Sequence, residues 1–297
     1  MWLILAFLSA FLLGFYDVFK KQSLKDNAVI PVLCFSTVLS ALFFLVLIVI
    51  SGRTSLLDGT LAHVPAIDAV THRCIILKAF IVSASWIFGY YGMKHLPITI
   101  VGPINATRPV LVLLGALLIF GERLNTLQWC GVLFTVVAFF LLGRSGKKEG
   151  IDFGHNRWIA CVILAALFGV VSALYDNYLM ARYDSMAVQA WCNVYIAIIM
   201  IAALFVFWYP KRASSPFRWT WFIVLISVFL TVADFAYFRS LSAEGSMLSI
   251  VSMVRRSNVL VSFLCGALFL HEKNARSKAL GLCMVLIGMV FLYFGSR

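Results

Sequence analysis

Apolar residues occur along this chain in long runs that short polar segments separate. A helix needs about 20 mainly apolar residues to cross roughly 30 Å of hydrocarbon. Ten runs of this kind can be marked off, at residues 2–19, 28–50, 74–96, 98–120, 126–143, 158–181, 186–209, 218–239, 245–270 and 276–295. The pattern therefore predicts an all-α polytopic membrane protein with ten transmembrane helices.

The composition of the 297 residues excludes a soluble domain. Apolar residues make up 63% and charged residues 12%, whereas soluble domains carry about 25% charged residues. The formal net charge is +12, but the basic residues lie mainly at the ends of apolar runs, where they anchor helices and set topology. We expect membrane lipid and a small molecule as partners, and no nucleic acid.

Neither cofactor nor enzyme chemistry is indicated by the remaining residue types. The seven cysteines form no CxxC pair or Cys/His cluster, so free thiols and no metal site are expected. No HExxH, GxSxG or Walker pattern is present. The first run begins at Met1 without a basic segment and is interpreted as a spanning helix. A monomer is compatible with the sequence, which predicts no particular oligomer.

An internal repeat divides the chain near its middle. The segment GALLIFGE (115–122) is followed nine residues later by Gly131, and GALFLHE (266–272) is followed nine residues later by Gly281. Small residues continue at heptad spacing in both copies, at Gly131, Ala138, Ser145 and at Gly281, Gly288, Gly295, which allows close helix approach. We predict a five-helix repeat over 1–143, a linker over 144–157 and a second repeat over 158–297. Because five is odd, the second repeat is inverted.

The two repeat ends, LLGALLIFGERLNTLQWCGVLFTVVAFFLLG and LCGALFLHEKNARSKALGLCMVLIGMVFLYFG, resemble the ten-helix EamA-type members of the drug/metabolite transporter superfamily. The resemblance covers essentially the whole chain. It implies a substrate cavity near the membrane midplane and transport by alternating access. The sequence departs from the family early in each half, where Leu13-Gly14 and Phe168-Gly169 replace the usual Trp-Gly or Trp-Ala.

Three arginines lie deep within apolar runs. Arg108 is in the fourth run, and Arg255 and Arg256 are in the ninth. Each costs at least about 2.5–3.5 kcal/mol at mid-bilayer depth, so each requires a partner, a cavity or a substrate. The repeat places them at one level from both halves, and guanidinium groups match carboxylate or phosphate. An anion-binding site is one interpretation.

The alternative is a purely structural network in which these arginines pair with acids of the apolar runs. The candidates for charge pairing or ion coupling are Asp17, Asp176 and Asp234. Lys20 and Lys21 reach Asp17 at i+3 and i+4, which leaves Asp234 as the expected arginine partner.

A basic residue in the fourth helix with a basic pair in the ninth resembles the phosphate-binding arrangement of plastid triose-phosphate translocators, a branch of the same superfamily. The resemblance implies that Arg108, Arg255 and Arg256 hold a phosphate. Arginine stands where that branch usually has lysine at the first and second of these positions, so the substrate stays open.

Other side chains could complete the site. Asn105 lies between Pro103 and Pro109, which interrupt backbone hydrogen bonding as in cavity-lining helices; a plain kink is the alternative. Tyr91 and Tyr237 could wall the cavity, or anchor the helices at the interface. Glu122 and Glu272 lie at helix ends and are interpreted as structural.

The sequence thus favours a secondary active transporter of a small anionic or zwitterionic metabolite, with an organophosphate as one candidate. The alternatives are an amino-acid or drug exporter with structural arginines and a non-transporting scaffold or receptor. Connections opposite the termini, including the 273–278 turn, carry roughly twice as many Lys and Arg residues, which places the termini outside by the positive-inside rule. The family resemblance implies cytoplasmic termini in a bacterial inner membrane, and we adopt that orientation.

Overall fold

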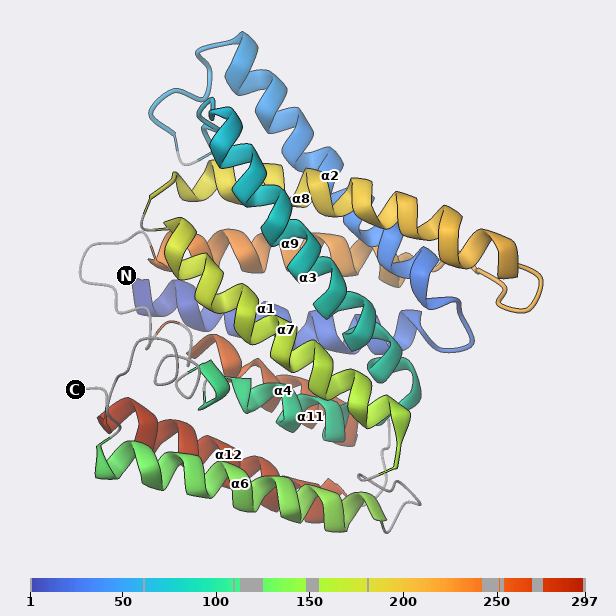
Figure 1. Cartoon of the computed structure of the whole chain (residues 1–297), viewed down its shortest axis with the longest axis vertical. Coiled ribbons are helices and arrows are strands. Elements are labelled where there is room, and N and C mark those ends of the chain that lie inside the picture. Colours follow the sequence, from blue (N-terminus) through green and yellow to red (C-terminus); the bar gives the residue numbers. More distant parts are fainter. Residues whose placement is uncertain are drawn as a thin grey trace.

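A computed structural model describes residues 2–60, 62–108, 110–112, 125–147, 155–180, 182–241, 251, 254–268 and 275–295. These residues contain no strand, and their helices lie side by side with both chain ends at one end of the bundle (Figure 1). The helices are α1 (Trp2–Ser23), α2 (Val29–Arg53), α3 (Ala69–His95), α4 (Ile98–Ala106), α6 (Thr126–Lys147), α7 (Arg157–Met180), α8 (Ser185–Ala203), α9 (Trp221–Leu241), α11 (Asn258–Leu268) and α12 (Ala275–Gly295).

Several helices extend beyond the apolar runs that predicted them. α3 begins at Ala69, five residues before the predicted run, because Asp68 caps it by accepting the Thr71 N–H at 3.1 Å. α8 begins after Asp184, which accepts the N–H groups of Met186 and Ala187, both at 2.9 Å. α8 continues as a π-helical turn over Leu204–Trp208 and a 3-10 turn over Tyr209–Lys211. Hydropathy therefore predicts the part of a helix that faces the bilayer, whereas the capping residues determine where the helix begins.

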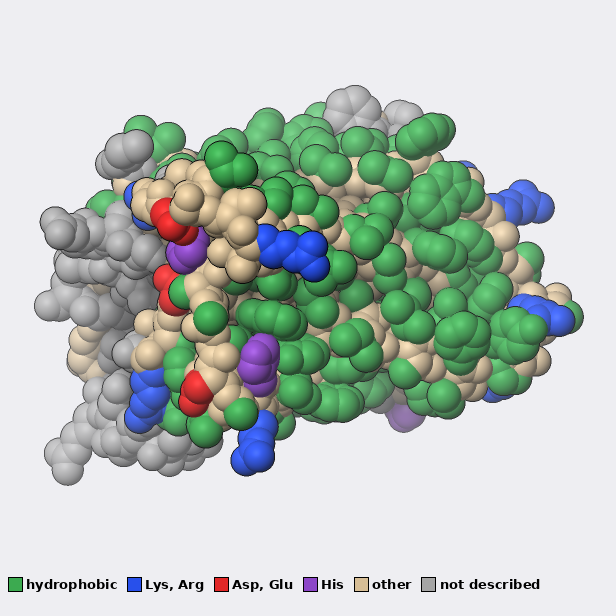
Figure 2. All heavy atoms as spheres, turned by 90° about the horizontal axis from the view of Figure 1, so that it is seen from above, with side chains coloured by type: hydrophobic (Ala, Val, Ile, Leu, Met, Phe, Trp, Pro, Cys, Tyr) green, Lys and Arg blue, Asp and Glu red, His purple; other side chains and the backbone are tan. Residues whose placement is uncertain are grey.

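Seven helices are long and apolar enough to cross a membrane within the described part of the chain. Two further apolar stretches, Ile98–Val112 and Trp129–Ala138, are shorter and run over or beside residues outside the description. Figure 2 shows hydrophobic side chains over most of one face, with charged side chains gathered toward its two ends. The chain is therefore a polytopic α-helical membrane protein. The count of ten spans stays a prediction.

The packing joins helices from the two halves of the sequence. α1 packs against α9, α3 against α7 and α2 against α8; α4 packs against α11, and α6 lies beside α12 (Figure 1). α1 also contacts α11, and α4 contacts α7. The largest apolar core contains residues from α1, α2, α3, α4, α7, α8 and α9. The two halves of the sequence form one interleaved bundle.

Glycine allows the closest of these approaches. A Cβ atom on Gly92 of α3 would lie 2.3 Å from Cγ2 of Val162 in α7, and one on Gly14 of α1 would lie 2.4 Å from Cβ of Val261 in α11. Such distances are far below van der Waals contact, so a larger residue at either position would separate the helices.

Five of the small residues in the repeat ends are buried where the two helices pack. Gly131 and Ala138 in α6 are buried, as are Gly281, Gly288 and Gly295 in α12. Phe134 and Phe291 stack across the same contact, with ring centroids 5.2 Å apart. The described residues of this pair pack through small and apolar side chains.

Candidate functional site

The predicted arginines lie beside two matching helix breaks. At Thr107, after α4, and at Ser257, before α11, the backbone N–H donates to the carbonyl three residues earlier, to Ile104 at 3.2 Å and to Val254 at 3.0 Å. Each hydroxyl donates to the same carbonyl, at 2.7 and 2.6 Å. A hydroxyl that bonds back to the chain competes with regular helix. Arg108 immediately follows one break, and Arg256 immediately precedes the other.

Arg255 is held by two residues of α9. Its guanidinium forms an ion pair with Asp234 and lies 3.9 Å from the centroid of the Tyr237 ring. The sequence singled out Asp234 as the acid for one arginine, and the structure identifies that arginine as Arg255. The Arg255 Nε has no hydrogen-bond partner among the described residues.

Arg108 and Arg256 differ from Arg255 because neither forms an ion pair with a described carboxylate. Arg108 donates to the Ala165 carbonyl of α7 at 3.2 Å and packs against Gly169, where a Cβ would lie 2.7 Å from the guanidinium carbon. Its charge interacts unfavourably with that of Arg256 and favourably with that of Asp17. Two cations in the interior therefore lack a direct counter-ion within the described part of the chain.

Asn105 and Arg108 also carry buried polar atoms without partners. The Asn105 Oδ1 and the Arg108 Nε make no hydrogen bond to a described residue. A buried polar atom left unpaired costs about 1–3 kcal/mol, so both atoms are suited to accept or donate to a bound molecule. Of the two prolines that flank Asn105 in the sequence, Pro103 lies within α4 and Pro109 lies outside the described residues.

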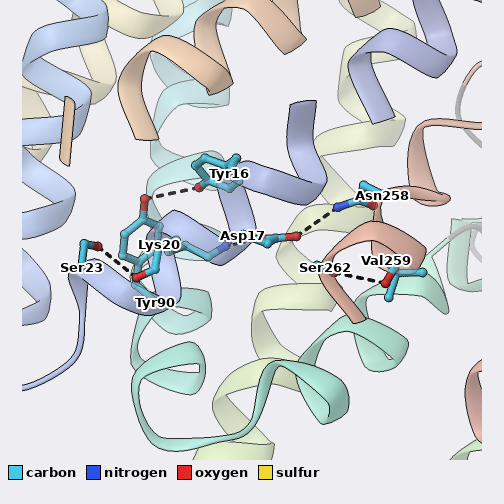
Figure 3. Close-up of polar contacts among 8 residues, drawn as sticks. All are labelled: Tyr16, Asp17, Lys20, Ser23, Tyr90, Asn258, Val259 and Ser262. Atoms are coloured by element: carbon cyan, nitrogen blue, oxygen red, sulfur yellow. Dashed lines mark hydrogen bonds and ion pairs between the residues drawn. The ribbon is translucent and has the colours of Figure 1, made fainter. Parts of the chain in front are cut away.

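Asp17 joins the two halves of the bundle (Figure 3). Its Oδ1 lies 2.7 Å from the Lys20 ammonium, and its Oδ2 accepts the Asn258 amide of α11 at 3.0 Å. Tyr16 on the same helix shares a hydroxyl contact of 3.3 Å with Tyr90 of α3, and the Lys20 ammonium lies 4.6 Å from the Tyr16 ring centroid. Lys21, considered as a partner for Asp17, instead donates to the carbonyls of Met93 and Leu96.

The third acid, Asp176, pairs with Lys78 of α3, a lysine that sequence reasoning missed. Lys78 is only 5% exposed. Its position inside an apolar run was the available signal, because a buried lysine requires a partner. The pair ties α3 to α7.

Lys278 corrects the assignment of residues 273–278 to a connecting turn. It lies in α12, is 0% exposed, and donates to the Thr99 hydroxyl of α4 at 2.9 Å. The predicted turn and the predicted run 276–295 overlapped at residues 276–278, and because the helix begins at Ala275, Lys278 belongs to the helix. Lys278 therefore does not belong among the interfacial Lys and Arg residues that were counted to predict the orientation of the termini.

The two tyrosines considered as walls of the cavity have different neighbours in the structure. Tyr237 contacts Arg255, whereas Tyr91 stacks on Trp158 of α7, with centroids 6.4 Å apart and planes 9° apart. Tyr91 thus contributes to helix packing, and no described contact links it to the arginines. Glu122 and Glu272 lie outside the described residues. Within the described part, no three His, Cys, Asp or Glu side chains gather as metal ligands, and the cysteines are unpaired.

Membrane-length helices that hold ion pairs, and arginines without a carboxylate partner among the described residues, indicate the class of the protein. Ionisable side chains within a membrane protein typically line substrate or ion pathways. This arrangement is typical of an integral membrane protein of the transport class.

The family follows from sequence comparison. The model of the EamA-like transporter family matches residues 1–144 and 156–294, and the chain belongs to that family. It is 21% identical over 279 residues to an uncharacterized transporter from Archaeoglobus fulgidus, with 94% of this chain and 93% of that protein covered. It is 22% identical over 220 residues to protein RarD from Streptomyces exfoliatus, with 73% of this chain and 65% of that protein covered.

A solved structure titled only as the crystal structure of a protein has the same fold. It aligns with a TM-score of 0.66 at 13% identity, covering 99% of this chain and 97% of the other. The family and the relatives make this protein a membrane transporter.

Proposed function

We propose that this transporter is a secondary carrier of a small anionic or zwitterionic metabolite, with an organophosphate as the first candidate. The observation that carries the proposal is the pair of interior cations, Arg108 and Arg256, without a carboxylate partner among the described residues. An anion between them would supply the missing charge, with Arg255 and the Asn105 amide as further donors.

Alternating access between two inverted five-helix repeats is the proposed mechanism. In the proposed repeats, α1, α2, α3, α4 and α6 correspond in order to α7, α8, α9, α11 and α12. When each helix is replaced by its counterpart, the α1–α9 contact becomes the α7–α3 contact, and the pairs α2–α8, α4–α11 and α6–α12 stay the same. A helix pairing that survives this exchange is what two inverted repeats would produce. The boundaries proposed for the repeats remain 1–143 and 158–297.

Contacts between the halves and a cavity at one end of the bundle support the proposal of access from one side at a time. Tyr16 contacts Tyr90, and Asp17 contacts Asn258, which is close to the arginines in the sequence, so α1 is tied to α3 and α11 (Figure 3). Toward the end with the termini lies a cavity of about 500 Å³ beside α8 and α9. Transport would require the Asp17–Asn258 contact to open, and Asp17, Asp176 or Asp234 could then exchange a proton.

Binding is tested by thermal unfolding of the detergent-purified protein with phosphate esters, inorganic phosphate, carboxylates, amino acids and cationic drugs. Ligands that bind the native state raise the unfolding temperature. We expect phosphate esters to do so in the wild type and to have no effect in Arg256→Ala. A shift with neutral or cationic compounds alone would contradict the anion site.

A second candidate is an amino-acid or drug exporter whose arginines are structural. The contacts of Arg108 with the Ala165 carbonyl and Gly169, and of Arg255 with Asp234, favour it. Uptake of the same panel into proteoliposomes distinguishes these substrates. A non-transporting scaffold or receptor would give no uptake of any compound. We further propose a bacterial inner membrane location, cytoplasmic termini and a lipid-facing apolar surface.

A further inference from the structure

The cavity at the bundle end that carries the termini is lined by none of the three predicted arginines. It has a volume of about 500 Å³ and is lined by Gly59, Thr60, His63 and Pro65 of the α2–α3 connection, by the start of α8 and by the last turns of α9. This volume is within the usual range of about 300–1,000 Å³ for small-molecule sites. Its wall combines a buried amide, two opposite charges and apolar side chains.

The buried amide is the most informative of these groups. Gln189 of α8 lines the cavity and is 3% exposed, yet neither its Nε2 nor its Oε1 has a hydrogen-bond partner among the described residues. Buried side-chain amides are rarely left unpaired because desolvation without a hydrogen bond is unfavourable. A carboxamide both donates and accepts, so its complement is another amide group, with one C=O and one N–H.

The charged groups of the cavity define two further features of a ligand. Asp184 is exposed and uses Oδ1 to cap α8, while its Oδ2 takes no part in the cap. Arg239, which is exposed near the end of α9, also lines the cavity and pairs with no described carboxylate. The two suit an ammonium group and a carboxylate on one molecule.

Apolar side chains complete the wall. Met186, Phe235 and Phe238 line the cavity, and the Phe238 ring lies 5.5 Å from the Lys78 ammonium. One aromatic ring thus lies between this cavity and the Lys78–Asp176 pair in the interior. The position is that of a vestibule in front of the buried charges.

We propose that this vestibule binds a small zwitterion that carries an amide group, of which a dipeptide with an apolar side chain is the simplest example. Arg239 binds the carboxylate, Asp184 binds the ammonium group and Gln189 pairs with the peptide group. The apolar side chain packs against Phe235 and Phe238. This site is separate from the arginine centre and does not depend on the function proposed for it.

Calorimetric titration of the detergent-purified full chain tests the proposal with three probes. Alanyl-phenylalanine carries all three features, N-acetylphenylalanine lacks the ammonium group, and phenylalanine lacks the amide. We expect saturable binding of the dipeptide at least about tenfold tighter than of either other probe, a difference equal to one well-placed hydrogen bond or charge pair.

Three variants assign the contacts. Asp184→Asn keeps the helix cap, because asparagine caps as well as aspartate, and should weaken the dipeptide about tenfold while leaving N-acetylphenylalanine unchanged. Arg239→Gln should weaken all three probes. Gln189→Leu should weaken the dipeptide and N-acetylphenylalanine but not phenylalanine. Arg53→Gln, an exposed arginine on the same end of the bundle, is the matched control and should bind like the wild type.

Protein folding is checked in the same samples. Gln189→Leu removes an unpaired buried amide, so its unfolding temperature without ligand should equal or exceed that of the wild type. The proposal fails if the dipeptide does not bind saturably, or if all three variants bind it like the wild type. It also fails if binding survives Arg239→Gln and disappears in Arg256→Ala, since the dipeptide would then occupy the arginine centre.

Discussion

Arg255 and Arg256 are adjacent in the sequence, yet their surroundings are opposite. Arg255 has a carboxylate, Asp234, and an aromatic ring, Tyr237, against its guanidinium, whereas Arg256 has no carboxylate partner among the described residues. Successive residues of a helix point about 100° apart, so neighbouring side chains face different helices. The comparison separates a cation that the fold neutralises from a cation that has no carboxylate partner in the described part of the chain.

The largest effect is expected from removing the acid of the neutralised pair. Asp234→Asn leaves Arg255 buried without its counter-ion, and breaking a buried pair in this way costs about 3–5 kcal/mol. The measurement is denaturation in mixed micelles. Asp58→Asn, on the exposed α2–α3 connection, is the control and should change little. Adding Arg255→Met to Asp234→Asn should recover most of the loss; no recovery would mean that Asp234 stabilises the fold through other contacts.

Removing the unpaired cation should act in the opposite direction. Arg256→Met eliminates a membrane-embedded charge that costs about 2.5–3.5 kcal/mol on insertion scales, so stability rises toward that amount while the phosphate-ester shift disappears. The matched variant Arg255→Met leaves Asp234 without its ion pair and should be less stable than the wild type. Equal effects of the two substitutions would contradict the division between them.

Packing between the halves can be tested with two glycines one turn apart on α3. A Cβ at Gly92 would lie 2.3 Å from Val162, whereas one at Gly89 would lie 3.6 Å from the Ala165 Cβ, an ordinary contact. Gly92→Ala should therefore cost about 1–3 kcal/mol. Gly89→Ala should stabilise by up to about 1 kcal/mol through helix propensity. Unfolding temperatures that fall equally in both variants would rule out a specific α3–α7 approach.

The smallest effect is expected at the contact that ties α1 to α11. Asn258→Leu removes the 3.0 Å hydrogen bond to Asp17 but leaves Lys20 beside that carboxylate, so the loss of stability should be about 1 kcal/mol. If the contact must open during transport, cysteine labels placed beside it should also react faster in the variant. Ser262→Ala removes only a bond within α11 and should leave labelling unchanged.

Much of the fold follows from local sequence. Apolar runs and the repeat of small residues from Gly131 and Gly281 act within a helix or between equivalent helices, so their spacing reveals them. The depth of Arg108, Arg255 and Arg256 is readable for the same reason. Lys78 and Lys278 were not recognised, since their burial depends on helices that pack against them from distant parts of the chain.

The sequence by itself thus determined the helical membrane class, the family and the presence of interior cations, because hydropathy and periodicity are properties of continuous segments. Only the tertiary structure decided which acid faces which cation, that Tyr91 packs on Trp158 instead of facing the arginines, and that Gln189 lines a cavity with Asp184 and Arg239. Those choices depend on the rotation and neighbours of each helix. Both are fixed when the two halves interleave.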